Sequence, residues 1–204
     1  MPHLLLPHPI RYWPIFLSLM MLLLVAFHSS LNGYLRFDES AIAQGQYWRL
    51  ITAHFVHLGW IHGLLNVGGL LLVAWVQPKG PFIYWLGFYV MCSGFISLVL
   101  FWGHQTPNYV GASGVLHGLL ILATFFSQWL EPWRRNLMIG VICLKLLWEQ
   151  SPFYANPEVE QLIGGYVVVD AHFLGGLAAM SILVAVGILR FYNHNNGLSF
   201  FKSR

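Results

Sequence analysis

Residues with nucleophilic and acid–base side chains gather at three places in the sequence. A serine hydroxyl is a weak nucleophile, so acyl transfer by serine requires a base within hydrogen-bond reach and donors for the oxyanion that forms on the attacked carbonyl. The sequence offers all three kinds of group. The first place holds His57, His62 and Asn66, the second holds Gly111, Ser113, Gly114 and His117, and the third holds Asp170, His172 and Gly175.

Small residues indicate how the second and third places approach each other. Helices that present small residues at four-residue intervals pack with their backbones close together. Such faces would carry Ser113 and His172, each next to a small residue, toward one another, and we expect them to act as nucleophile and base. The intervals are formed by Gly114 and Gly118 in one helix and by Ala171, Gly175 and Ala179 in the other.

The remaining polar residues predict an oxyanion hole but no third catalytic acid. His62 and Asn66 are four residues apart and share a helix face, so both could donate to the oxyanion together with the backbone amide of Ser113. Asp170 is two residues from His172 and points to nearly the opposite side of a helix. Because we expect no other carboxylate in this layer, the sequence predicts a Ser–His dyad rather than a triad.

Each of these residues also has a purely structural interpretation. A membrane serine usually bonds its own backbone, and a buried histidine often bonds a neighbouring helix. Lys145 is considered because Ser–Lys dyads exist, but Glu149 follows four residues later and offers an ion pair, so we expect a structural role. His117, four residues after Ser113, is expected to pack against the ring of His172 and support the site.

The composition indicates a membrane protein. Of 204 residues, 57% are hydrophobic and 8% are charged, and the mean hydropathy is +0.64. Roughly a quarter of the residues in a soluble domain are charged, so these values exclude a disordered chain, a disulfide-rich secreted module and an ordinary cytosolic enzyme. The net charge of +3 is too small to indicate a nucleic-acid partner. The two cysteines, Cys92 and Cys143, lie in apolar runs and are expected to be packing residues.

Apolar runs of about 20 residues predict an all-α bundle of six transmembrane helices. The second, fourth and sixth helices are entered from the same side, so their first turns, which hold the candidate residues, lie at similar depth. We expect one membrane domain over residues 1–204 and no soluble domain. The predicted spans are about 12–28, 58–77, 81–102, 112–130, 133–150 and 168–192.

The distribution of cations predicts the orientation of this bundle. Cytoplasmic loops carry an excess of Lys and Arg, and alternate loops of this chain differ strongly in that respect. Both termini are therefore expected in the cytoplasm, with Arg36, Arg49 and most acidic residues on the opposite side, where the candidate site opens. The cations assigned to the cytoplasmic side are Arg11, Lys79, Arg134, Arg135, Arg190, Lys202 and Arg204.

A haem or metal membrane protein is the competing function. The chain has 10 histidines, and His117 with His172 or His62 could supply an axial pair across a bundle. That function leaves the glycine-flanked Ser113 unexplained. Zinc proteases of the membrane require a histidine followed by glutamate, and this pair does not occur in the sequence. The expectation is therefore a protease without a cofactor.

The chain resembles the rhomboid intramembrane serine proteases over essentially its whole length. The resemblance implies that Ser113 is the nucleophile, His172 the base and His62 and Asn66 the oxyanion donors, with His57 among the supporting residues. It also implies a multi-pass protein of the bacterial inner membrane that cleaves membrane-anchored proteins near or in their transmembrane segment. The motifs that carry it are Trp48-Arg49, His57-x4-His62-x3-Asn66, Gly111-x-Ser113-Gly114 and Ala171-His172-x-x-Gly175.

One position departs from the ordinary rhomboid pattern. Many rhomboids have tyrosine four residues after the serine, packed on the catalytic imidazole, and this chain has His117. That variant is similar to the rhombosortase branch, which cuts exported proteins near a C-terminal Gly-rich sorting tail. The resemblance implies such tails as substrates, with other single-span proteins as the alternative. Water or an amine would resolve the acyl-enzyme, and both routes remain open, as does the oligomeric state.

Overall fold

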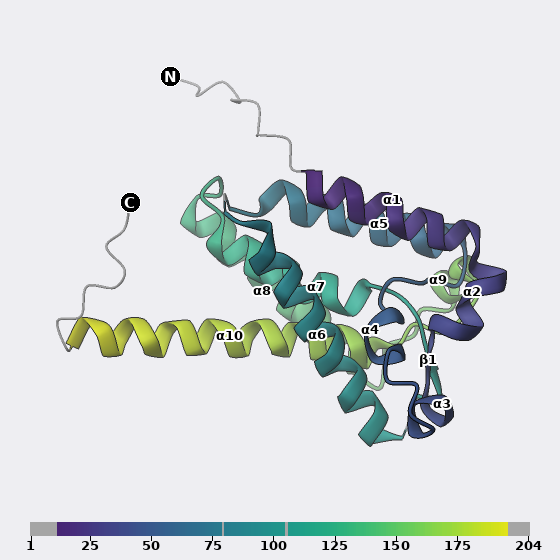
Figure 1. Ribbon diagram of the computed structural model, residues 1–204. Coiled ribbons are helices and arrows are strands. Elements are labelled where there is room, and N and C mark those ends of the chain that lie inside the picture. Colours follow the sequence, from purple (N-terminus) through teal and green to yellow (C-terminus); the bar gives the residue numbers. More distant parts are fainter. Residues whose placement is uncertain (1–11, 79, 105, 196–204) are drawn as a thin grey trace.

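The computed structural model describes residues 12–78, 80–104 and 106–195 (Figure 1). This part of the chain is nearly all helical. Its helices are α1 (Tyr12–Ala26), α2 (His28–Leu35), α3 (Glu39–Ala43), α4 (Arg49–Thr52), α5 (Trp60–Val76), α6 (Phe82–Gly103), α7 (Ser113–Phe126), α8 (Pro132–Glu149), α9 (Pro157–Ile163) and α10 (Val169–Asn195). Two short strands, β1 (Phe37–Asp38) and β2 (Asn108–Tyr109), pair antiparallel, with Phe37 opposite Tyr109.

The six longest helices coincide with the six predicted apolar ranges, and their bounds differ from the predicted ones by a few residues. By length and hydropathy, α6 and residues 169–193 of α10 could cross a bilayer, and α1 with α2 adds a third candidate if this pair, bent by 105°, is one span. Helices α5 and α7 are apolar but shorter. The structure thus confirms a nearly all-α membrane protein, whereas the count of six spans stays a prediction.

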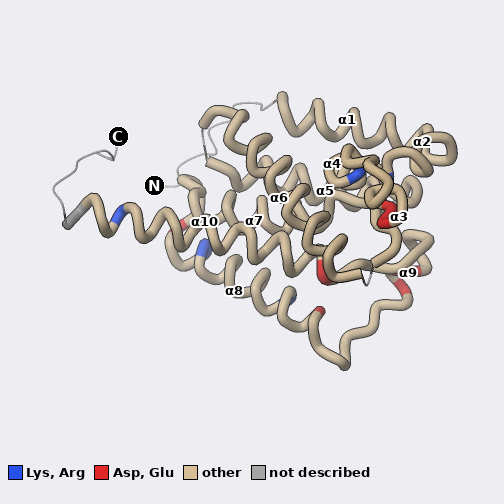
Figure 2. The backbone as a smooth tube through the Cα atoms, turned by 60° about the horizontal axis from the view of Figure 1, so that its bottom comes forward, with Lys and Arg blue, Asp and Glu red and all other residues tan. Residues whose placement is uncertain are grey.

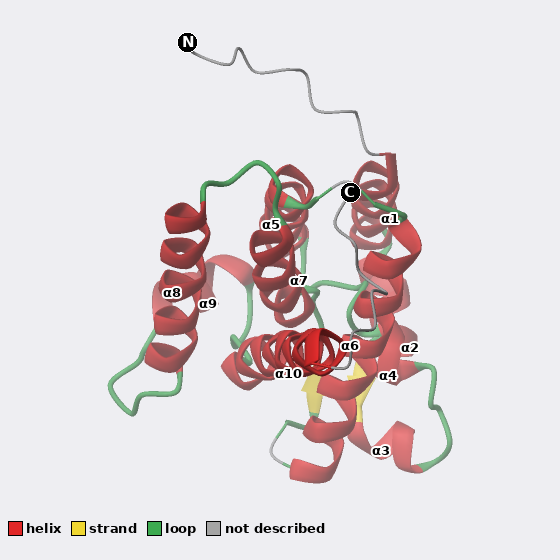
Figure 3. Ribbon diagram, turned by 90° about the vertical axis from the view of Figure 1, so that its left-hand side faces the viewer, coloured by secondary structure: helices red, strands yellow, loops and turns green. Residues whose placement is uncertain are grey.

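Helix α7 lies at the centre of the bundle, packed against α5, α6, α8 and α10 (Figure 3). Most of its residues are buried, as expected for a helix that is apolar on every face. The surrounding helices expose large apolar side chains, such as Leu144 on α8 and Ile188 on α10. A belt of this kind suits contact with lipid.

The backbones of α7 and α10 touch. A Cβ atom added to Gly114 would lie 2.6 Å from the carbonyl oxygen of Ala171. A Cβ on Gly175 would meet the carbonyl oxygen of Gly114, and one on Gly118 would meet that of Gly175. The prediction that the two small-residue faces meet is therefore confirmed.

Charged residues divide between the two ends of the bundle (Figure 2). The acids of α3 and α9 and the end of α8 lie at one end, and the arginines near the start of α8 and the end of α10 lie at the other. This division agrees with the predicted orientation, which stays a prediction. Four of the cations assigned to the cytoplasm, Arg11, Lys79, Lys202 and Arg204, lie outside the described residues.

A buried arginine anchors the segment between α1 and α5. The Arg49 side chain is almost fully buried, and its guanidinium donates to the carbonyl oxygens of Gly33 and Arg36, both at 2.9 Å. Next to it, the indole N–H of Trp48 donates to the carbonyl oxygen of Tyr34 at 3.1 Å. These bonds tie α2 to α4, so this Trp-Arg pair holds the fold of the segment together.

Candidate active site

Ser113 is the first residue of α7, and a turn at Gly111 precedes the helix. Gly111 has φ +121°, a conformation that L side chains rarely adopt, and a Cβ there would lie 2.8 Å from the ring of His62. The amide of Gly111 donates to the carbonyl oxygen of Ala53 at 2.9 Å, and the Tyr109 hydroxyl donates to the carbonyl oxygen of Gly111 at 2.6 Å. Because the first amides of a helix lack partners within it, the N–H of Ser113 is available to an oxyanion.

His172, in the first turn of α10, reaches the serine. Its Nε2 lies 2.9 Å from Ser113 Oγ, within hydrogen-bond distance. His172 is buried, with 7% of its surface exposed, whereas Ser113 is half-buried. The predicted approach of Ser113 and His172 is confirmed, and it follows from the contact of the α7 and α10 backbones.

The expectation that no carboxylate reaches His172 is wrong. Both carboxylate oxygens of Glu149 lie near Nδ1 of His172, at 3.1 and 3.2 Å. Glu149 is the last residue of α8, which ends at the level where α10 begins. In the sequence, Glu149 has an evident partner only in Lys145 on its own helix, and its spacing gives no signal of this contact between helices. Asp170, by contrast, is exposed, as expected.

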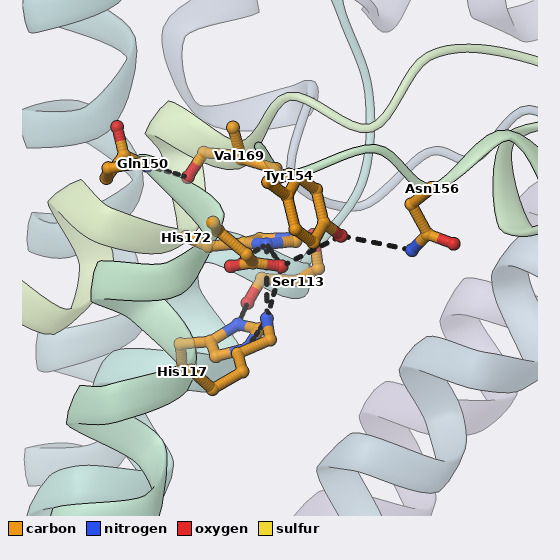
Figure 4. Close-up of polar contacts among 9 residues, drawn as sticks. Ser113, His117, Gln150, Tyr154, Asn156, Val169 and His172 are labelled. Atoms are coloured by element: carbon orange, nitrogen blue, oxygen red, sulfur yellow. Dashed lines mark hydrogen bonds and ion pairs between the residues drawn. The ribbon is translucent and has the colours of Figure 1, made fainter. Parts of the chain in front are cut away.

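His117 stacks on the imidazole of His172, with ring centroids 4.4 Å apart and an interplanar angle of 30°. This packing was predicted and is confirmed. Its Nδ1 lies 2.7 Å from the carbonyl oxygen of Ser113, and its Nε2 lies 2.7 Å from Nζ of Lys145 (Figure 4). Lys145 also forms the predicted ion pair with Glu149, at 2.8 Å. The link from Lys145 to His117 has no signal in the sequence.

These contacts define the protonation of both imidazoles. A carbonyl or carboxylate oxygen can only accept, so Nδ1 of His117 donates to Ser113 and Nδ1 of His172 donates to Glu149. Nε2 of His117 is then an acceptor for the Lys145 ammonium, and Nε2 of His172 is an acceptor for the Ser113 hydroxyl. This is the tautomer in which His172 can take the proton of the serine. All four ring nitrogens of His117 and His172 thus take part in hydrogen bonds.

The two predicted oxyanion donors lie on the same face of α5 and border the same cavity as Ser113 and His172. The Asn66 side-chain amide donates to the carbonyl oxygen of His62 at 2.9 Å and keeps a second N–H. The amide of Leu58 lies 3.4 Å from Nδ1 of His62, which makes that nitrogen an acceptor and leaves the proton on Nε2, beside Gly111. Both residues are thus prepared to donate, and their role in the oxyanion hole stays a prediction.

His57 supports His62 from the loop before α5. Its ring meets the ring of His62 edge-on, with centroids 5.0 Å apart. Its carbonyl oxygen accepts a hydrogen bond of 2.8 Å from the side chain of Asn32. Burial lowers the pKa of His57 to about 3, so this ring is neutral at physiological pH. Among the described residues, neither ring nitrogen of His57 has a hydrogen-bond partner, and its supporting role stays a prediction.

A cavity of about 540 Å³ opens beside Ser113. Most of its surface is apolar, and its lining comes from α2, β2, α5, α7, α9, the segment that leads to α10 and the first turn of α10, with Arg36 as a charged member. Among the apolar lining residues are Leu58, Leu65, Leu116, Leu120, Ile163 and Val168. The volume and lining suit a short extended peptide segment with small or apolar side chains.

Residues 44–189, well over half of the chain, match the Rhomboid domain. The protein therefore belongs to the rhomboid family, a family of intramembrane serine proteases that act on membrane-anchored substrates. The matched region contains Ser113, His172, Glu149, His117, Lys145, His62 and Asn66. No curated protein matches this chain in sequence.

Proposed function

We propose that this protein is an intramembrane serine protease in which Ser113 is the nucleophile and His172 the general base. The observation that carries the proposal is the 2.9 Å contact between Ser113 Oγ and Nε2 of His172, in a ring whose other nitrogen already donates. A nucleophile, its base and an orienting partner of the base are the parts that serine acyl transfer needs.

The reaction proceeds in two stages. His172 takes the hydroxyl proton as Ser113 Oγ attacks the scissile carbonyl, and the oxyanion accepts hydrogen bonds from His62, Asn66 and the amide of Ser113. The intermediate collapses as His172 gives the proton to the leaving amine, and an ester to Ser113 remains. Water or a primary amine, deprotonated by His172, then attacks the ester. The bond from the acyl carbon to Ser113 Oγ breaks as His172 returns the proton to Oγ, and the product leaves with a free carboxylate or with an amide to the acceptor.

The proposed substrates are exported proteins with a C-terminal Gly-rich sorting tail that ends in a membrane helix and basic residues. The support for this rhombosortase-like specificity is His117, which stands where many rhomboids have tyrosine, and the cavity beside Ser113 has room for a short extended segment of such a tail. The proposed location is the bacterial inner membrane with both termini cytoplasmic, supported by the separation of charges between the ends of the bundle (Figure 2). Single-span proteins without such a tail are the alternative substrates.

The test uses the full chain in liposomes with two single-span substrates, one with a Gly-rich sorting tail and one without it. Mass spectrometry of the new C-terminus identifies the cleaved bond, and a primary amine in the assay distinguishes hydrolysis from transfer. We expect cleavage of the tailed substrate, lost in Ser113→Ala. Equal cleavage of both substrates would contradict the branch but not the protease, and turnover retained in Ser113→Ala would overturn the proposed function.

A further inference from the structure

We infer that Glu149 is the positioning residue of His172 and that Lys145 holds it in place, so that the site is a Ser113–His172–Glu149 triad with a lysine support. The inference rests on the proposed function and deepens it. The side chain of Glu149 is 4% exposed, yet it ends α8 with its carboxylate against the base. A buried carboxylate at this point needs a cation and hydrogen-bond donors to offset its loss of hydration.

Glu149 has these partners. The Lys145 ammonium lies 2.8 Å from the carboxylate, and the side chain of Lys145 is 41% exposed, so the cation keeps part of its hydration. The Tyr154 hydroxyl lies 3.5 Å from the same carboxylate and accepts a 3.0 Å hydrogen bond from Asn156 (Figure 4). The carboxylate is therefore held in one orientation, with its accepting oxygens directed at Nδ1 of His172.

This arrangement gives Glu149 two tasks. Its bond to Nδ1–H keeps the proton of His172 on that nitrogen, so Nε2 stays a free acceptor for the serine proton. When His172 takes that proton, the carboxylate faces a full positive charge at hydrogen-bond distance, and it stabilises this imidazolium without accepting a proton itself.

Lys145 also links Glu149, the partner of the base, to His117, which is bonded to the nucleophile Ser113. Its ammonium contacts Nε2 of His117 as well as Glu149, and His117 donates to the carbonyl oxygen of Ser113. One cation thus supports the partner of the base and the residue that stacks on the base. The ammonium also lies 3.4 Å from Nδ1 of His172, but that nitrogen carries a proton and cannot accept from it.

The test compares Glu149→Gln, Glu149→Ala and Lys145→Met in liposomes, with Glu158→Gln as the matched control. Glu158 is exposed on α9, near the same end of the bundle, and its change removes the same charge. In Glu149→Gln we expect kcat to fall on the order of 100-fold or more with KM within about twofold, because the amide can stabilise the wrong tautomer. In Lys145→Met we expect a smaller fall in kcat than in Glu149→Gln, and in Glu158→Gln we expect the kcat of the wild type.

Chemical rescue separates positioning from folding. In Glu149→Ala the space of the carboxylate is empty, so added formate should restore part of kcat, whereas Glu149→Gln, whose amide fills that space, should not respond. The labelling rate of Ser113 by a fluorophosphonate should follow the same order in each variant. Wild-type kcat in Glu149→Gln, or loss without formate rescue in a folded Glu149→Ala, would overturn the inference while leaving the protease intact. A wild-type protein that neither cleaves nor labels would overturn the proposed function and the inference together.

Discussion

The ring of His117 covers one face of the ring of His172, at a centroid distance of 4.4 Å. His172 is therefore held from two directions, by the stacked ring on its face and by Glu149 on its edge. A base with a fixed rotamer already directs Nε2 at the serine. The reaction then loses less conformational entropy on the way to the transition state, and this lowers its barrier.

A substitution series at His117 tests the stacked ring. His117→Tyr should retain activity within about tenfold of the wild type, because a phenol presents a similar face, and His117→Ala should lose on the order of 100-fold by freeing the base. His117→Leu should lie between them. The measurement is the cleavage rate in liposomes. Equal rates for Tyr and Leu would remove the stacking role, and a Tyr variant as inactive as Ala would show that the hydrogen bonds of the imidazole, to Lys145 and to Ser113, are needed.

The losses of cleavage rate caused by substitutions at Ser113 and at His172 should not be additive. Ser113→Ala, His172→Ala and the double variant should all fall to a similar residual rate, because the serine is inert without its base and the base has no other task. Cleavage rates of the three variants, each checked for folding by thermal unfolding in detergent, provide the measurement. A double variant much slower than either single variant would mean that the two residues act independently.

Loss of one oxyanion donor should cost about 3 kcal/mol in the transition state, or on the order of 100-fold in rate. We expect this for Asn66→Ala and for His62→Ala, with folded protein in both cases. The cleavage rate and fluorophosphonate labelling of Ser113 are measured together. If either variant stays within about twofold of the wild-type rate while the probe still labels Ser113, that residue has only a structural role.

The contact between α7 and α10 should tolerate no added methyl group at Gly175. Its Cβ would meet the carbonyl oxygen of Gly114, so Gly175→Ala must push the helices apart, at a cost of about 1–3 kcal/mol and with loss of the Ser113–His172 contact. Gly187→Ala on the same helix is the control, because its Cβ would meet no atom of the described residues within 4 Å beyond its chain neighbours and its own helix backbone. Thermal unfolding and cleavage are measured for both. Equal behaviour of the two variants would contradict the close approach as the determinant of the site.

The helix ranges were predictable because apolar runs of bilayer length leave little choice of structure, and breaks such as Glu131-Pro132 mark their ends. The approach of Ser113 to His172 was predictable for a different reason: small residues at four-residue intervals mark the faces where helices touch. Both signals are local in the sequence.

The role of Glu149 was not predictable in this way. Along its own helix Glu149 has an obvious partner in Lys145, and this local pair satisfies the charge of both residues. Its contact with His172 arises only because the end of α8 and the start of α10 meet, across an intervening loop whose path no spacing rule describes. The same holds for Lys145 and His117, which are brought together by the packing of α7 against α8.

The strand pair of β1 with β2 couples two parts of the chain that are distant in the sequence. The loop that leads to Ser113 is fastened to the segment between α1 and α5 through Phe37 opposite Tyr109 and through the bond from Gly111 to Ala53. The residues that make these links, Phe37, Ala53 and Tyr109, are buried in the hydrophobic core. The orientation of Ser113 therefore depends on the packing of a segment that lies far away in the sequence. A disturbance of that segment reaches the nucleophile through the backbone, although the segment carries neither the base nor its partner.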